Sequence, residues 1–270
     1  NIGTTTSPSW RNWYNGGQLG STYTAYSNGS QNFSANGTCT SKLISAQGCG
    51  GLTSVTGASG TVYNLVDING QCWMKTNLNE VPSAYSTASG GSGTGAAWTT
   101  NSPGNVGYWG YHNTTTTSGV SGWATTVPAA GEGLLYQWSA AMNGSTTERA
   151  QGACPSGFHI PSDCEWMYLE HGQGMSITQQ TTSGTTARST TGEGTKLKAT
   201  SSPYFTALLA GDRFTSGTFY NHGTYGGWWS SSSVAGASDA QRRYLYSGDA
   251  GVFRGSLDKA CGYSVRCLKD

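Results

Sequence analysis

The sequence predicts an α+β fold of mostly short antiparallel strands, with two short helices and long loops. Three observations lead to this prediction. Short apolar runs alternate with turns that contain Gly, as they do in antiparallel hairpins. Only two segments space their apolar residues as a helix does. Gly alone supplies 41 of the 270 residues, which favours turns and loops over long regular elements.

The clearest strand signal is a hairpin within residues 61–78. Its two apolar runs flank Asn69-Gly70, a dipeptide typical of two-residue hairpin turns. The last third of the chain also alternates short apolar runs with turns, and these runs predict strands of an antiparallel sheet. They are FTALLAGDRF, GTFYNHGTYGGWWSSS, RRYLYSG, GVFRGS and GYSVRCL.

Two short helices are predicted, separated from the hairpin by loops. Within residues 132–142, Leu135, Trp138 and Met142 recur at helical spacing. The second helix covers residues 162–170, where Ser162 suits the N-cap and Glu165, three residues later, completes a capping box. Residues 83–130 are mostly small or polar, so we expect long surface loops there, and such loops often carry binding surface.

The chain divides into an N-terminal β-rich arm or small subdomain, residues 1–60, and a larger domain, residues 61–270. The first region has few aliphatic residues but many aromatic ones, which must be buried elsewhere because each hidden ring is worth about 2 kcal/mol or more. We expect these rings to dock on the larger domain or on a neighbouring copy of the chain. They are Trp10, Trp13, Tyr14, Tyr23 and Tyr26.

The charge composition excludes several partners. Charged residues make up only 10% of the chain, and 14 basic residues balance 13 acidic ones, so no basic patch for nucleic acid or anionic lipid is expected. No run of about 18 apolar residues is present, and we therefore expect no membrane span. The chain begins at Asn1 without a basic and apolar leader, as expected of a processed end.

The cysteine pattern predicts an extracellular location, at the cell surface or secreted. Seven cysteines lack the CxxC spacing of zinc sites, and in a chain with so few charges they favour disulfides formed in an oxidising compartment. A bridge between Cys39 and Cys49 would close an 11-residue segment in a region with little core and contribute ~2 to 3 kcal/mol. The partners of Cys72, Cys164 and Cys261 stay open, and an odd count leaves one cysteine over.

Three motifs carry a resemblance to a known family. They are DINGQCWMKTNL (67–78), GACPSGFHIPSDCEWMYLE (152–170) and GYSVRCLKD (262–270). Over about residues 62–270 the chain resembles the Fibrobacter succinogenes major paralogous domain, a repeated module of bacterial surface proteins. That family is similar to the C-type-lectin-like superfamily, so the resemblance implies a C-type-lectin-like fold. It also implies a disulfide between Cys154 and Cys267, because that superfamily joins these two places.

We expect no metal site, catalytic residue or cofactor. The Glu-Pro-Asn or Gln-Pro-Asp loop and the Trp-Asn-Asp strand of calcium-dependent lectins are absent, and the carboxylates are dispersed, whereas calcium needs six to eight oxygen ligands. The four histidines occur singly, which favours structural roles. They are His112, His159, His171 and His222.

One stretch gathers aromatic rings together with Gly and is the candidate ligand-binding site. It contains Tyr220, His222, Tyr225, Trp228 and Trp229. Rings stack on the CH groups of sugars while polar neighbours bond to hydroxyls, so such a stretch suits a contact surface. The alternative is that Trp228 and Trp229 alternate across a strand, with at least one of them in the core.

These observations predict a non-enzymatic extracellular module for adhesion or ligand binding, with a surface glycan, or carbohydrate more generally, or a protein as partner. The first alternative is a structural subunit of an extracellular filament, pilus or surface layer, whose partners are other copies of itself. The second is an enzyme similar to the formylglycine-generating oxidases of the same superfamily, which bind copper through a close cysteine pair. Cys261 and Cys267 would lie ~20 Å apart in an extended strand and do not suit that role.

Overall fold

A computed structural model describes residues 24–25, 30–32, 39, 43–85, 107–114, 123–184, 186–200, 204–236 and 238–270. The predicted aromatic residues of the N-terminal arm, Trp10, Trp13, Tyr14, Tyr23 and Tyr26, lie outside this part of the chain, as do residues 86–106 and 115–122 of the predicted loop region. Strands in the described part are mostly antiparallel, as predicted, and four helices accompany them.

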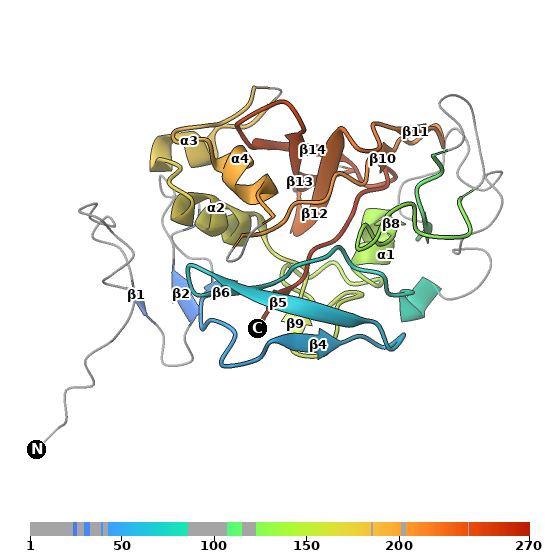
Figure 1. The fold of residues 1–270 in the computed structure, drawn as a ribbon, viewed down its shortest axis with the longest axis horizontal. Coiled ribbons are helices and arrows are strands. Elements are labelled where there is room, and N and C mark those ends of the chain that lie inside the picture. Colours follow the sequence, from blue (N-terminus) through green and yellow to red (C-terminus); the bar gives the residue numbers. More distant parts are fainter. Residues whose placement is uncertain are drawn as a thin grey trace, which may run out of the picture.

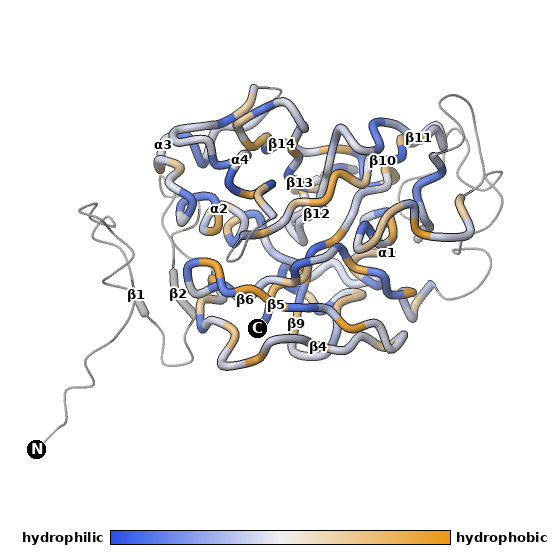
Figure 2. The backbone as a smooth tube through the Cα atoms, in the orientation of Figure 1, coloured by the Kyte–Doolittle hydropathy of each residue, from blue (hydrophilic) through white to orange (hydrophobic). Residues whose placement is uncertain are grey.

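The lower part of the molecule is a five-stranded sheet (Figure 1). Its order is β4 (Ser54–Thr56), β5 (Val62–Ile68), β6 (Gln71–Met74), β15 (Leu268–Lys269) and β9 (Phe158–His159). The predicted hairpin is confirmed. Ile68 pairs with Gln71, and Asn69 and Gly70 between them have φ angles of 53° and 76°, as a type I′ turn requires. Hydrophobic and hydrophilic residues are mixed along this hairpin (Figure 2). In β5, Tyr63, Val66 and Ile68 are buried, whereas Val62, Asn64 and Asp67 are exposed.

A second, three-stranded antiparallel sheet forms the upper part of the molecule (Figure 1). It consists of β12 (Tyr225–Ser233), β13 (Asp239–Tyr246) and β14 (Phe253–Asp258). The short hairpin of β10 (Asp212–Arg213) and β11 (Phe219–Tyr220) adjoins it through a bridge between Gly211 and Gly226. The remaining strands are β1 (Thr24–Ala25), β2 (Ser30–Asn32), β3 (Leu43–Ser45), β7 (Trp109–Gly110) and β8 (Leu135–Tyr136).

The helices are α1 (Trp138–Ala141), α2 (Asp163–Gly172), α3 (Ile177–Thr181) and α4 (Glu193–Lys198). The capping box that predicted α2 is present, because the Ser162 side chain accepts a hydrogen bond from the Glu165 amide and the Glu165 side chain accepts one from the Ser162 amide. Helices α3 and α4 occupy a Ser/Thr/Gly-rich stretch where no helix was predicted. No described helix is long and apolar enough to cross a membrane.

The helix predicted over residues 132–142 was mostly wrong, since only one turn of it is helical. Two long-range constraints override the helical spacing. Tyr136 exchanges backbone hydrogen bonds with Tyr263, at 2.8 and 3.0 Å, which holds β8 extended. Gly133 has a φ of 65°, and a Cβ there would lie 2.3 Å from the carbonyl oxygen of Leu78. The segment therefore packs as a strand before it turns into α1.

Three disulfides link distant parts of the chain. Cys154 is joined to Cys267, the bridge that the family resemblance implied. The predicted pairing of Cys39 with Cys49 was wrong: Cys39 is joined to Cys164 and Cys49 to Cys72. The reason is tertiary packing, because Cys39 lies in an apolar cluster with side chains of α2. Cys261 is the cysteine left over, and it is buried.

Two of these bridges, Cys39–Cys164 and Cys49–Cys72, cross the boundary predicted at residue 60, and β4 pairs with β5 across it as well. At the same place the amide of Gly48 donates to the carbonyl oxygen of Gly70, at 2.5 Å. Residues 43–60 are therefore attached to the larger domain by covalent and backbone bonds. The division of the chain at residue 60 stays a prediction.

A buried network of charges holds α2 against the upper sheet. Asp163 pairs with Arg243 and Arg254, both at 2.6 Å. Glu170 pairs with Arg243 at 2.5 Å and with Arg188 at 2.8 Å. Each buried carboxylate meets two guanidinium groups, which offsets the cost of removing these charges from water.

A second buried network surrounds Glu165 at the start of α2. His159 donates to Glu165, with Nε2 at 3.0 Å from Oε2, and its Nδ1 lies 2.7 Å from Asp270 Oδ1. Glu165 also accepts from Arg149 Nε and from the backbone amide of Ser45, each at 3.0 Å. This network joins α2 to β3 and to the segment that follows β15.

Candidate functional site

The predicted aromatic site is divided between the core and the surface. The side chains of Tyr225, Trp228 and Trp229 are 3% exposed or less, so they cannot form a contact surface, and that part of the prediction was wrong. Trp228 packs on Trp166, and its neighbour Trp229 donates to the carbonyl oxygen of Tyr136 at 2.8 Å. Both faces of β12 are covered, so neighbouring tryptophans that point to opposite faces are both buried.

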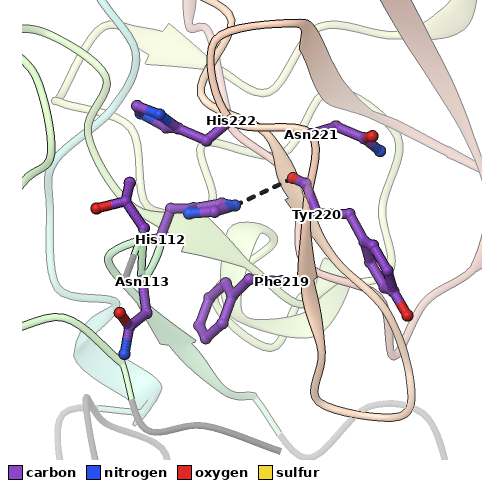
Figure 3. Close-up of a pocket in the computed structure, with 7 residues that line it drawn as sticks. His112, Asn113, Phe219, Tyr220, Asn221 and His222 are labelled. Atoms are coloured by element: carbon purple, nitrogen blue, oxygen red, sulfur yellow. Dashed lines mark hydrogen bonds between the residues drawn. The ribbon is translucent and has the colours of Figure 1, made fainter. Parts of the chain in front are cut away.

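The other two predicted residues, Tyr220 and His222, do line a cavity of about 310 Å³ (Figure 3). One wall comes from residues 112–114, which follow β7, and the other from β11 and the turn after it. The lining residues are His112, Asn113, Thr114, Phe219, Tyr220, Asn221 and His222. Tyr220 contributes its backbone, because its ring points away from His112 (Figure 3).

His112 is held in place by several neighbours. It is only 4% exposed, and its ring centroid lies 5.0 Å from that of Phe219 and 5.2 Å from that of His222. Burial lowers the pKa of His112 to about 4, although the hydrogen bond to Tyr220 opposes this effect. The imidazole is therefore neutral at pH 7.

The hydrogen bonds of His112 fix its tautomer. Nε2 lies 3.0 Å from the carbonyl oxygen of Tyr220, and because a carbonyl only accepts, Nε2 must carry the hydrogen. Nδ1 is then a hydrogen-bond acceptor. It is buried and has no hydrogen-bond partner among the described residues.

Local backbone geometry places His112 at this position. Gly211, with a φ of 71°, lies directly behind the ring, and a Cβ there would be 2.7 Å from His112 Nε2. Any other residue would push the imidazole away from Tyr220. Phe219 is fixed from behind by the guanidinium of Arg213, which lies 4.5 Å from its ring centroid and 4.2 Å from that of Trp123.

The second histidine is held by a carboxylate. His222 Nε2 lies 2.9 Å from Glu132 Oε2, so this nitrogen donates to Glu132. Beside it, Asn221 adopts a φ of 63° and donates its amide to Asp212 at 3.2 Å. Burial raises the pKa of Asp212 to about 6, while Asn221 stabilises its charged form. The turn after β11 is thus fixed by two acidic side chains beneath it.

Metal and thiol chemistry has little support in the described residues. They contain no group of three or more His, Cys, Asp or Glu side chains that could hold a metal ion. Cys267 is engaged with Cys154, and burial raises the pKa of the Cys261 thiol to about 12. These two cysteines therefore do not form the close pair that a copper-dependent oxidase needs.

Sequence reasoning missed five of the seven lining residues. The single occurrence of His112 favours a structural role, and no sequence pattern points to Asn113 or Thr114 as part of a ligand site. The contact between His112 and Tyr220 spans 108 residues of sequence, so no local spacing could reveal it. Asn221 lies within the aromatic stretch and Phe219 directly precedes it, so both could have been included with it.

Fold and cavity together define a disulfide-bonded module of mostly antiparallel strands with one polar and aromatic cavity at the β10–β11 hairpin. The sequence model of the Fibrobacter succinogenes major domain matches residues 66–269. The chain belongs to this family, as the three motifs indicated. No curated protein and no solved structure matches the chain.

Proposed function

We propose that this chain is an extracellular module of a bacterial surface that works by binding a ligand, in adhesion or recognition, and that the ligand occupies the cavity beside His112. The observation that carries the proposal is the cavity itself, which combines the aromatic rings of His112, Phe219 and His222 with the polar side chains of Asn113, Thr114 and Asn221. Pockets that combine apolar walls with a few fixed polar groups are the usual small-molecule sites of proteins.

The disulfides support the extracellular location, because such bonds persist in oxidising compartments. We also propose that the fold is C-type-lectin-like. The bridge from Cys154, which precedes β9, to Cys267, which precedes β15, supports this relation. The relation concerns the fold alone.

A variant that fills the cavity tests the proposed function. Thr114 is exposed at the rim, so Thr114→Trp should block the cavity while the domain still folds. The matched control is Thr178→Trp, at an exposed position of α3 outside the cavity. Both proteins are applied to arrays of surface glycans and extracellular proteins. We expect Thr114→Trp to lose binding and Thr178→Trp to keep it; binding that survives in both variants would exclude the cavity as the site.

A filament or surface-layer subunit is the second candidate, favoured by the edge strand β4. Among the described strands, β4 pairs only with β5, so its outer edge can accept a strand from another copy. Leu65 donates to the carbonyl oxygen of Thr53, and the alternation of an antiparallel ladder then directs the amides of Ser54 and Thr56 away from β5. The N-terminal arm is the proposed donor.

Particle size distinguishes the two candidates. Thr56→Pro removes one outward amide and should abolish assembly through this edge, while Thr56→Val keeps the amide and serves as the control. Deletion of residues 1–35 should have the same effect as Thr56→Pro if the arm is the donor. Light scattering over a range of concentrations measures assembly, and a chain that stays monomeric in all forms would exclude the filament function.

A further inference from the structure

We propose that an exposed pair of aromatic rings on the β10–β11 hairpin, those of Phe214 and Tyr220, binds a single uncharged sugar unit. This site is separate from the cavity beside His112 and goes beyond the proposed function. Three properties of the pair support it, namely the exposure of both rings, the uncharged polar residues next to them, and the fixed backbone beneath them.

The two rings are open to solvent and pack against each other. Phe214 is 39% exposed and Tyr220 is 41% exposed, and their ring centroids lie 5.2 Å apart. Both side chains project from the same face of the hairpin, because Tyr220 pairs directly with Asp212, two residues before Phe214. The ring of Tyr220 points away from Phe219, which lines the cavity (Figure 3). The pair therefore forms a surface of its own, outside the cavity.

The size and geometry of the pair suit a small ligand. A Phe or Tyr side chain offers about 150 to 250 Å² of surface, so the exposed parts of the two rings amount to about 120 to 200 Å². Apolar patches that mark protein interfaces are larger than a few hundred Å². The two ring planes meet at 87°, so both cannot lie against one flat surface, such as that of a crystalline polysaccharide. One sugar ring, with CH groups on more than one side, fits such a pair.

The residues next to the rings are polar but uncharged. Residues 214–224 contain no Lys, Arg, Asp or Glu. Thr215 and Asn221 directly follow the two rings in sequence, and both are at least partly exposed. Their side chains can donate and accept hydrogen bonds. A sugar unit places CH groups on ring faces and hydroxyls beside such neighbours, whereas a purely apolar ligand would gain nothing from them and a charged one would meet no opposite charge among them.

The backbone beneath the rings is fixed by hydrogen bonds. Arg213, which precedes Phe214, exchanges backbone hydrogen bonds with Gly262, at 3.0 and 2.7 Å. The amide of Phe214 donates to the carbonyl oxygen of Thr218 at 3.0 Å, which closes the end of the hairpin. A site that is already ordered in the free protein loses little conformational entropy when it binds a ligand.

The experiment uses the full chain with ¹³C-labelled Phe and Tyr rings, whose NMR signals report contacts with each ring. The probes are the methyl glycosides of glucose, galactose, mannose and N-acetylglucosamine, with phenol, triglycine and glucuronate for comparison. We expect at least one methyl glycoside to bind with a Kd on the order of 1 mM and to shift the ring signals of both Phe214 and Tyr220. The three comparison compounds should bind more weakly.

Substitutions at the two exposed rings locate the site. Phe214→Ala and Tyr220→Ala should each weaken binding of the glycoside about tenfold, which corresponds to about 1.4 kcal/mol. Both variants should fold, because neither side chain is buried. Tyr220→Phe keeps the ring and should retain most of the binding. The matched control is Tyr246→Ala, at a ring on β13 that is also 41% exposed, and it should bind as the unaltered chain does.

Several results would overturn the sugar proposal. They are ring signals that no glycoside shifts at concentrations well above the expected Kd, unchanged binding in both alanine variants, equal weakening in Tyr246→Ala, or tighter binding of phenol, triglycine or glucuronate than of every glycoside.

The cavity and the ring pair are tested independently of each other. Thr114→Trp should leave the shifts of the Phe214 and Tyr220 ring signals unchanged, and loss of these shifts would contradict a separate site. The comparison of Thr114→Trp with Thr178→Trp is repeated with Phe214→Ala present in both, so that binding at the rings does not conceal a loss at the cavity. Failure of the sugar proposal therefore leaves the proposed function standing, and failure of the cavity test leaves the ring pair standing.

Discussion

The buried pair of His159 and Glu165 should make the stability of this module fall at alkaline pH. His159 and Glu165 are 1% and 0% exposed, so solvent screens their interaction little. Burial alone would lower the pKa of His159, but Glu165 and Asp270 outweigh it and raise this pKa from 6.5 to about 9. Because the folded pKa is above the unfolded one, the stabilisation is complete below pH 6.5 and is lost as the pH rises through 9.

A pKa raised by this amount corresponds to about 3 kcal/mol of unfolding free energy. Glu165, the acidic partner, makes the stability fall at acidic pH as well. Burial alone would raise the pKa of Glu165, but His159 and Arg149 lower it from 4.5 to about 2, so stability is also lost as the pH falls below 4.5 toward 2. The losses of stability at alkaline and at acidic pH report one shared interaction, so the two free energies must not be added.

Urea unfolding at pH 6 and at pH 9.5 measures the loss of stability at alkaline pH. We expect the unaltered chain to lose about 3 kcal/mol more between these two pH values than His159→Gln does, since the variant has no imidazole to titrate. His171→Gln, at a histidine outside this network, is the control and should keep the full loss. Equal losses in the unaltered chain and in His159→Gln would refute the reasoning.

Three further predictions concern stability. Replacing Cys39 and Cys164 by Ser opens a link between residues 125 apart in sequence and should cost about 5 kcal/mol by chain entropy, measured by urea unfolding; a loss below about 1 kcal/mol would contradict this. Arg266→Met should cost about 3 kcal/mol or more, because this buried guanidinium satisfies Asn77 Oδ1 and three backbone carbonyls; Arg266→Lys should cost less. A chelator should move the melting temperature by no more than about 2 °C, as expected of a chain that needs no calcium.

Short sequence patterns correctly predicted the parts of the fold that depend on interactions between residues close in sequence. The β5–β6 hairpin follows from the positive φ angles that Asn69 and Gly70 tolerate, and the start of α2 follows from the hydrogen bonds between Ser162 and Glu165. Each involves residues within four positions of one another. The strand at Leu135–Tyr136 instead depends on Tyr263, and helical spacing could not indicate that pairing.

The same distinction applies to the candidate site and to the disulfides. The aromatic stretch correctly drew attention to Tyr220 and His222, but composition could not separate them from Trp228 and Trp229, because burial on both faces of β12 is a tertiary property. His112 and Cys164 likewise acquire their partners only when segments more than 100 residues apart meet. The disulfide between Cys154 and Cys267 could be predicted because the family resemblance indicates which distant cysteines pair.

Strand β15 has a consequence for how the protein is made. Leu268 pairs with Trp73 on one side and with His159 on the other, so a strand from the very end of the fold lies between two strands made much earlier. During synthesis, β6 and β9 cannot pair with β15 until residue 268 has left the ribosome. The disulfide of Cys154 likewise cannot form until Cys267 has been made. The order of synthesis itself therefore postpones closure of the five-stranded sheet until β15 has been made.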